Sequence, residues 1–170
     1  MLDWQNIEKT HRHEIWSVVY RILANEEDAR DCYQDVFLEA VRNRDASEVR
    51  SWGAFLRWLA TRRAIDLLRV RRRQRTASLA GQDQVGTAGH DSQIEFTELV
   101  DAVRNELTRL PENQATVFWL FSVEGLTYEE IAESTESSVN AVGIAIHRAR
   151  QTLKQRLAAL NKQESEQPAK

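Results

Sequence analysis

The chain has 170 residues, of which 42% are hydrophobic, and this fits one ordinary domain or two small ones with compact cores. Two prolines and six glycines are too few to divide it into the many short strands of an all-β protein, so we predict an all-α fold. The single cysteine, Cys32, excludes an internal disulfide framework. No signal peptide or membrane-spanning run is evident, so we expect a cytoplasmic protein without membrane insertion.

The net charge of −3 is distributed unevenly along the chain. Residues 50–75 contain nine arginines and one acid, Asp66, so this window carries +8 and the remainder −11. Guanidinium groups stay charged and bind phosphate oxygens in pairs, which makes the window a candidate surface for a polyanion. A solvated, salt-bridged helix face would have the same composition, and charge alone does not separate these interpretations.

The first 75 residues predict a helical domain. Apolar spacing from Ile7 to Leu23 indicates one or two helices, and Asn25 followed by three acids indicates the start of another. That helix has an apolar stripe ending at Val41, beside an acidic stripe formed by Asp28, Asp31, Asp35 and Glu39.

A long amphipathic helix follows, with apolar residues at three- and four-residue steps from Trp52 to Leu68. We assign Trp52 to the core and leave Trp58 open between core packing and stacking on a base. The residues expected on or near the side opposite the core are Arg57, Trp58, Thr61, Arg62, Ile65 and Arg69.

Residues 76–97 are rich in Ser, Thr, Gly, Gln and Asp and contain no Lys or Arg, so we predict a flexible linker. It separates the domain at 1–75 from a second domain at 98–160, and a polar tail follows at 161–170. Together these ranges predict two small helical domains.

The second domain is predicted to contain a helix-turn-helix. Pro111 precedes a helix at 112–123, and Thr127 with Glu130 forms a capping box that opens a short helix. After a turn at 135–137, the last helix has an apolar stripe beginning at Val139 and ending at Leu157. A short helix, a tight turn and a longer helix are typical of DNA-binding motifs, although ordinary helical bundles share the spacing.

The sequence does not favour an enzyme. One E-x-x-H motif occurs, from Glu8 to His11, whereas a carboxylate-bridged dimetal site needs two. Cys32 has no evident base beside it, and no phosphate-binding glycine loop is present. We expect no catalytic residue, no metal and no cofactor.

Three segments stand out together: DARDCYQDVFLEAV at 28–41, FLRWLATRRAIDLLRVRRR at 55–73, and LPENQATVFWLFSVEGLTYEEIAES at 110–134 followed by VNAVGIAIHRARQTL. In this order, over almost the whole chain, they resemble bacterial sigma factors of the sigma-70 family. The resemblance is closest to the small extracytoplasmic-function group, which keeps regions 2 and 4 joined by a linker. It implies a protein that binds core RNA polymerase and directs promoter-specific transcription initiation.

The resemblance also implies partners and contact residues. Region 2 would dock on the clamp coiled coil of the largest polymerase subunit, and the flap region would be a second polymerase contact. An anti-sigma factor is a further partner that the resemblance allows. The docking residues implied are Asp31, Gln34, Asp35 and Leu38.

Promoter DNA is the other implied partner. The loop at 43–51 would hold a base flipped from the non-template strand, and Arg150 or Lys154 would lie near the DNA backbone. The implied minus-10 contacts are Arg57, Thr61, Arg62, Arg63 and Arg69, and the implied minus-35 contacts are Asn140, Ala141, Ile144, His147 and Arg148.

The sequence differs from the family's usual pattern at positions that bear on promoter choice. Gly143 and Ala145 stand where the recognition helix usually carries Lys or Arg, and Glu136 stands where the turn usually has Gly. Arg62 replaces a common Asn. The alternatives to a sigma factor are a stand-alone helix-turn-helix regulator and a helical adaptor that binds a protein through its acidic helix.

Overall fold

The computed structural model describes residues 3–43, 49–78 and 92–165, and every regular element in these ranges is a helix, which confirms the all-α prediction. The helices are α1 (Trp4–Leu23), α2 (Glu26–Asn43), α3 (Trp52–Ser78), α4 (Ser92–Leu107), α5 (Glu112–Ser122), α6 (Tyr128–Ser134) and α7 (Val139–Ser165). Among the residues described, no helix is both long and apolar enough to cross a membrane.

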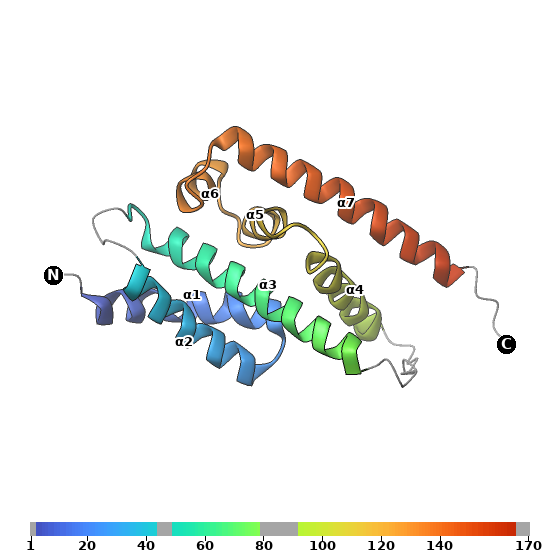
Figure 1. The fold of residues 1–170 in the computed structure, drawn as a ribbon, viewed down its shortest axis with the longest axis horizontal. Coiled ribbons are helices and arrows are strands. Elements are labelled where there is room, and N and C mark those ends of the chain that lie inside the picture. The colour runs from blue at the N-terminus through green and yellow to red at the C-terminus, as the bar shows by residue number, and fades with distance from the viewer. Residues whose placement is uncertain (1–2, 44–48, 79–91, 166–170) are drawn as a thin grey trace.

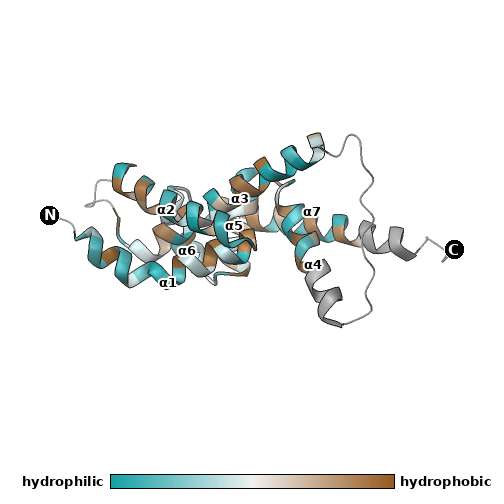
Figure 2. Cartoon of the chain, turned by 90° about the horizontal axis from the view of Figure 1, so that it is seen from below, coloured by the Kyte–Doolittle hydropathy of each residue, from teal (hydrophilic) through white to brown (hydrophobic). Residues whose placement is uncertain are grey.

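The helices form layers around α3. The pair α1 and α2 packs on one side of α3, α5 and α6 pack on the other side, and α7 lies across α4, α5 and α6 (Figure 1). Buried apolar residues of these helices form the core clusters, while the C-terminal end of α3 is mostly hydrophilic (Figure 2). This end carries part of the arginine-rich window.

Local capping signals fix most of the helix starts. The Asn25 side chain accepts a hydrogen bond from the Asp28 amide at 3.0 Å, and Thr127 and Glu130 form the predicted reciprocal capping box. Asp3 caps α1, with its carboxylate accepting from the Asn6 amide. Pro111 is the residue directly before α5.

The helices reach further than the predicted domain boundaries. Helix α3 continues to Ser78 and α4 begins at Ser92, so both ends of the predicted linker at 76–97 are helical, while 79–91 lie outside the described residues. Helix α7 likewise continues to Ser165, into the predicted tail. A polar composition indicates where a helix no longer packs against its neighbours. It does not by itself end the helix, and no proline interrupts these segments.

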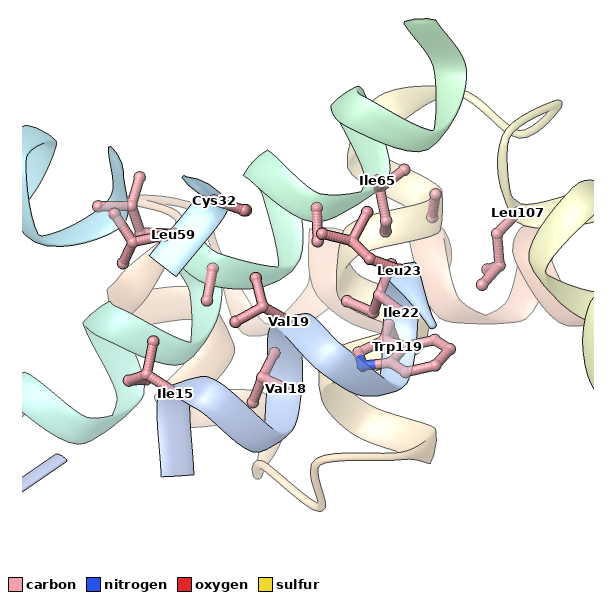
Figure 3. Packing of buried hydrophobic residues seen from close by; sticks show 14 of the residues in the cluster. Ile15, Val18, Val19, Ile22, Leu23, Cys32, Leu59, Ile65, Leu107 and Trp119 are labelled. Atoms are coloured by element: carbon pink, nitrogen blue, oxygen red, sulfur yellow. The ribbon is translucent and has the colours of Figure 1, made fainter. Parts of the chain in front are cut away.

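The two predicted domains share one hydrophobic core. Trp119 of α5 is buried in the same cluster as Ile22 and Leu23 of α1 (Figure 3). Leu107 and Leu110 join this cluster from the second domain. A second cluster combines Ala54 and the partly buried Trp58 of α3 with apolar residues of α5, α6 and α7, so Trp58 packs between the domains.

Candidate protein and nucleic-acid interfaces

The outer face of α2 presents an unpartnered seam. Asp31, Gln34, Leu38 and Val41 follow one another at steps of three, four and three residues, opposite the buried stripe of this helix. Leu38 is 51% exposed and Val41 is 49% exposed. The prediction that Val41 belongs to the core stripe is therefore wrong, because Val41 continues the outward-facing row of Leu38, while the neighbouring Ala40 is fully buried.

The acidic stripe of α2 divides into two parts. Glu39 forms ion pairs with Arg62 and Arg63, and Asp28 forms an ion pair with Arg71, so these acids connect α2 to α3. Asp31 and Asp35 are exposed, and within the described residues neither has a hydrogen-bond or ion-pair partner. Together with the seam, Asp35 gives α2 a surface that is both acidic and apolar.

One row of α3 lies beneath the second domain. The row follows helical steps of four, three, four and four residues, and it consists of Ala54, Trp58, Thr61, Ile65 and Arg69. Thr61 and Ile65 are 0% exposed, which contradicts their predicted placement on the open side of the helix. The sequence pattern of α3 shows a stripe facing α1 and α2, but it gives no sign that α5 and α6 cover the opposite side.

Arg69 fixes the end of this row to the turn between α4 and α5. Its guanidinium donates to the backbone oxygen of Leu110 at 3.0 Å and to that of Thr108 at 3.4 Å. Arg72 donates to the Thr108 hydroxyl at 3.0 Å. These hydrogen bonds hold the two domains together through groups that could otherwise contact phosphates.

Most of the arginine-rich window is paired. Within the described residues, six of its nine arginines form ion pairs, and only one of the acids involved, Asp66, belongs to the window itself. Arg57 pairs with Glu14 at 3.3 Å, and Arg62 also lies over the Trp58 ring at 4.8 Å from its centroid. The interpretation as a salt-bridged helix face thus applies to most of the window, and binding of a polyanion stays a prediction for the rest. The arginines without an acidic partner in the described structure are Arg72, Arg73 and Arg75.

The described part of the predicted base-holding loop is its C-terminal end, because 44–48 lie outside the described residues. The Ser51 hydroxyl accepts from the Ala54 amide and caps α3, and Arg50 pairs with Glu133 of α6 at 3.6 Å. The hollow beside these groups measures about 20 Å³, room for about one water molecule. In this arrangement α6 occupies the space beside the loop.

Helices α6 and α7 have the predicted helix-turn-helix geometry. The turn between them contains Glu136 at φ +52°, a left-handed conformation that favours glycine, which is the residue usual at this position in the family. Ser138 caps α7 through a hydrogen bond from the Ala141 amide. All five predicted minus-35 residues are exposed on one side of α7: Asn140, Ala141, Ile144, His147 and Arg148.

Two of the departures from the family pattern lie in different environments. Ala145 is buried in the second cluster, so this position faces the core and not solvent. Gly143 lies on the outer side, where an added Cβ would be 3.4 Å from the Tyr128 ring. Val139 was predicted in the core stripe but is 43% exposed, because it begins α7 before the helix reaches its packing partners.

The residues weighed for catalysis have structural surroundings. Glu8 accepts hydrogen bonds from Arg12 and Tyr33, which lower the pKa of its carboxyl. Burial and the charge of Asp35 raise the pKa of the Cys32 thiol to about 12, so this thiol stays protonated and unreactive at neutral pH.

Two family profiles match this arrangement. Residues 9–75 match the family described as Sigma-70 region 2, and residues 101–153 match Sigma-70, region 4. The ferric citrate uptake sigma factor FecI of Escherichia coli is 30% identical over 146 residues, covering 83% of each chain. This chain therefore belongs to the sigma-70 family of RNA polymerase sigma factors, in its extracytoplasmic-function group.

Other relatives agree with this assignment. The ECF RNA polymerase sigma factor SigE of Mycolicibacterium smegmatis is 28% identical over 162 residues, which cover 93% of this chain but 63% of that protein. The structure of the sigma factor RpoE from Bartonella quintana, solved with the anti-sigma factor NepR, superposes with a TM-score of 0.56 over 92% of this chain and 97% of that chain. At 22% identity this likeness supports the fold alone.

Proposed function

We propose that this protein is the promoter-selecting subunit of a bacterial RNA polymerase. It binds the core enzyme through region 2, recognises minus-10 and minus-35 elements, and stabilises the opened strands, acting in the cytoplasm where polymerase works. Catalysis belongs to polymerase, and the sigma subunit contributes binding energy alone. The anti-sigma factor bound to the RpoE neighbour supports a similar partner for this chain.

The observation that carries the proposal is the exposed seam of α2. Its three-four-three spacing matches the a and d positions of a coiled coil, so Gln34, Leu38 and Val41 can insert between side chains of a coiled coil on polymerase. The exposed, unpaired carboxylates of Asp31 and Asp35 favour a partner surface with positive charge. We assign docking to Asp31, Gln34, Asp35 and Leu38, and add Val41.

Helix α3 supplies the minus-10 contacts in this proposal. Arg73 and Arg75 are exposed and can reach phosphates directly, since no acid neutralises them in the described structure, whereas Arg72 must first release the Thr108 hydroxyl. Two of the other residues assigned to this element, Thr61 and Arg69, become available when region 4 moves off α3, whereas Arg57, Arg62 and Arg63 must exchange their ion pairs with Glu14 and Glu39 for phosphates. Holding an extruded base and the neighbouring phosphates offsets the few kcal/mol that unstacking a base costs.

Helix α7 supplies the minus-35 contacts through Asn140, Ala141, Ile144, His147 and Arg148. The first turns of a recognition helix lie closest to base edges in the major groove, and these residues occupy those turns. Arg150 and Lys154 are exposed further along the helix, where they can contact the DNA backbone.

Gel filtration with core polymerase tests the docking surface. Wild-type protein should elute with the core enzyme, whereas Asp35→Arg should lose the complex by at least ten-fold in affinity and keep its helical circular dichroism, because Asp35 is exposed. Glu26→Arg is the matched control, since it reverses an exposed charge on the same helix roughly 120° away from the seam.

The rival interpretations predict other outcomes. If wild-type protein stays separate from core polymerase but binds DNA, the chain is a stand-alone regulator. If Asp35→Arg and Glu26→Arg weaken the complex equally, the seam is not the docking surface.

A further inference from the structure

The recognition helix carries an apolar surface that the assigned polar contacts do not use. Val139 and Ile144 are 43% and 44% exposed, which makes them two of the most exposed large hydrophobic side chains in the described structure. They line a hollow of about 440 Å³ together with Tyr128, Asn140, Gly143 and His147. Two apolar side chains in water at the N-terminal end of α7 need a partner that removes them from solvent.

The floor of this hollow depends on Gly143. An added Cβ would be 3.4 Å from Cε2 of Tyr128, so the ring lies against the glycine. Tyr128 is itself held edge-on against Phe121, with ring centroids 5.0 Å apart. The hollow is therefore bounded by a fixed aromatic ring and by the Val139 and Ile144 side chains, with polar groups at its edge.

The charge of the surrounding surface favours DNA as the occupant. Residues 139–163 contain no Asp or Glu, whereas Arg148, Arg150 and Lys154 are exposed along α7. This face of α7 therefore repels neither phosphate strand of a duplex, and its cations release counterions on binding, while the exposed acids of the motif, Glu129, Glu133 and Glu136, belong to α6 and the turn. A protein partner that used this apolar patch would not require such a one-sided charge.

Resting on the function proposed above, we infer that this hollow reads thymine in the minus-35 element, with Ile144 and Val139 contacting the thymine 5-methyl group. Thymine is the base that presents a methyl group in the major groove, and apolar side chains are the groups that recognise it. The helix that usually presents Lys or Arg to guanine here carries Gly143, so base choice depends on the methyl contact, with Arg148 and His147 left for guanine or phosphate.

The test replaces thymine by deoxyuridine, which keeps the base-pair hydrogen bonds and removes only the methyl group. The DNA is an upstream element selected by the holoenzyme from a randomised library. Each thymine is replaced in turn, and holoenzyme affinity is measured. One or two positions should weaken binding about four-fold, equivalent to about 0.8 kcal/mol for one methyl-sized group.

Variants connect that loss to Ile144. Ile144→Ser should bind the thymine element more weakly than wild type and show no further loss with deoxyuridine, because the methyl contact is already absent. Val123→Ser is the matched control, since Val123 is 39% exposed but lies outside the hollow, and it should keep full methyl sensitivity. Circular dichroism confirms the fold of both variants.

Several results would overturn the inference. They are a selected element without thymine, equal affinity for every deoxyuridine duplex, or the same methyl sensitivity in Ile144→Ser as in wild type. A weaker complex of Ile144→Ser with core polymerase, at unchanged DNA affinity, would assign the patch to a protein partner instead. Failure of the proposed function would be evident earlier, as no polymerase complex before DNA is added, and it would remove this inference as well.

Discussion

Two non-glycine residues of the described structure have a left-handed backbone conformation, which glycine adopts more easily. Ala24, which ends α1, and Glu136, in the helix-turn-helix, have φ of +50° and +52°. A residue with a Cβ loses about 1–2 kcal/mol in the left-handed region, whereas glycine does not. Replacing such a residue with glycine removes this strain. It also increases the conformational entropy of the unfolded chain, which offsets part of the stabilisation.

We therefore expect Glu136→Gly to stabilise the protein by about 0.5–1 kcal/mol, which raises its melting temperature by roughly 1–4 °C at this chain length. Thermal unfolding followed by circular dichroism measures the shift. Glu136→Ala keeps a Cβ at the same φ and should show no comparable gain. A lower melting temperature for Glu136→Gly would mean that the Glu136 side chain contributes more than its backbone costs.

Several individual side chains were placed correctly from the sequence and others were not, for identifiable reasons. Ile144 was predicted on the outside and is exposed, because helical periodicity is reliable within a long amphipathic element. Val41 and Val139 were predicted in apolar core stripes but are exposed, because Val41 lies on the outward-facing row of α2 and Val139 lies in the first turn of α7. Thr61 is buried by a domain more than 50 residues away in the sequence, and no local pattern carries that information.

At the scale of elements, α1 and α2 are joined by a hydrogen bond between side chains. The Tyr33 hydroxyl donates to the Glu8 carboxylate at 2.6 Å. Burial, together with this bond, raises the pKa of Tyr33 to about 12, while the bonds from Arg12 and Tyr33 lower the pKa of Glu8. A depressed carboxyl pKa contributes stability above its ordinary value of 4.5 and loses it as the pH falls through the folded value.

Tyr33→Phe should accordingly lower the free energy of unfolding by about 1–2 kcal/mol at pH 7. The difference from wild type should be constant from pH 6 to 9, since neither group titrates there, and should shrink below pH 4.5 as Glu8 is protonated. Urea unfolding across this pH range provides the measurement. Tyr20→Phe is the control, because Tyr20 is exposed and has no hydrogen-bond partner in the described structure; equal losses in both variants would disprove the role of the bond.

Element starts were predicted better than element ends. Asn25 and the Thr127 capping box are local signals that satisfy free backbone amides, so the sequence identifies them directly. The ends of α3 and the start of α4 lie inside a polar segment that reads as linker, yet Thr76–Ser78 and Ser92–Thr97 are helical. Propensity is too weak there to distinguish an exposed helical turn from coil.

At the scale of the whole molecule, region 4 covers two of the α3 residues that the proposal assigns to promoter DNA, Thr61 and Arg69, while the α2 seam and the outer face of α7 stay open. Polymerase can therefore dock on this arrangement, but full contact between α3 and DNA requires the regions to separate. The sequence predicted two domains with a linker between them. The sequence could not predict that the two domains contact each other. Apolar residues such as Trp119 and Leu110 are found both in an interface between domains and in the core of a single domain, so their composition does not distinguish the two.

Arg104 is a contact between the regions that lies outside every proposed docking or DNA surface. Its guanidinium donates to the Arg21 backbone oxygen at 2.8 and 3.1 Å, linking α4 to α1. Arg104→Ala should weaken the closed arrangement by about 1–2 kcal/mol and so raise the open population about 5- to 30-fold. DNA affinity of the free protein can rise by at most the same factor, because only the open form exposes the covered row of α3.

Single-molecule energy transfer between dyes at Gln5→Cys and Gln155→Cys measures this population, since both positions are exposed and the buried Cys32 stays unlabelled. Arg30→Ala is the control, because Arg30 pairs with Glu26 inside α2 and contributes nothing between regions. An unchanged open population in Arg104→Ala would show that the apolar contact around Trp119 alone holds the regions together. A larger open population without any gain in DNA affinity would show that the covered row of α3 does not limit promoter binding.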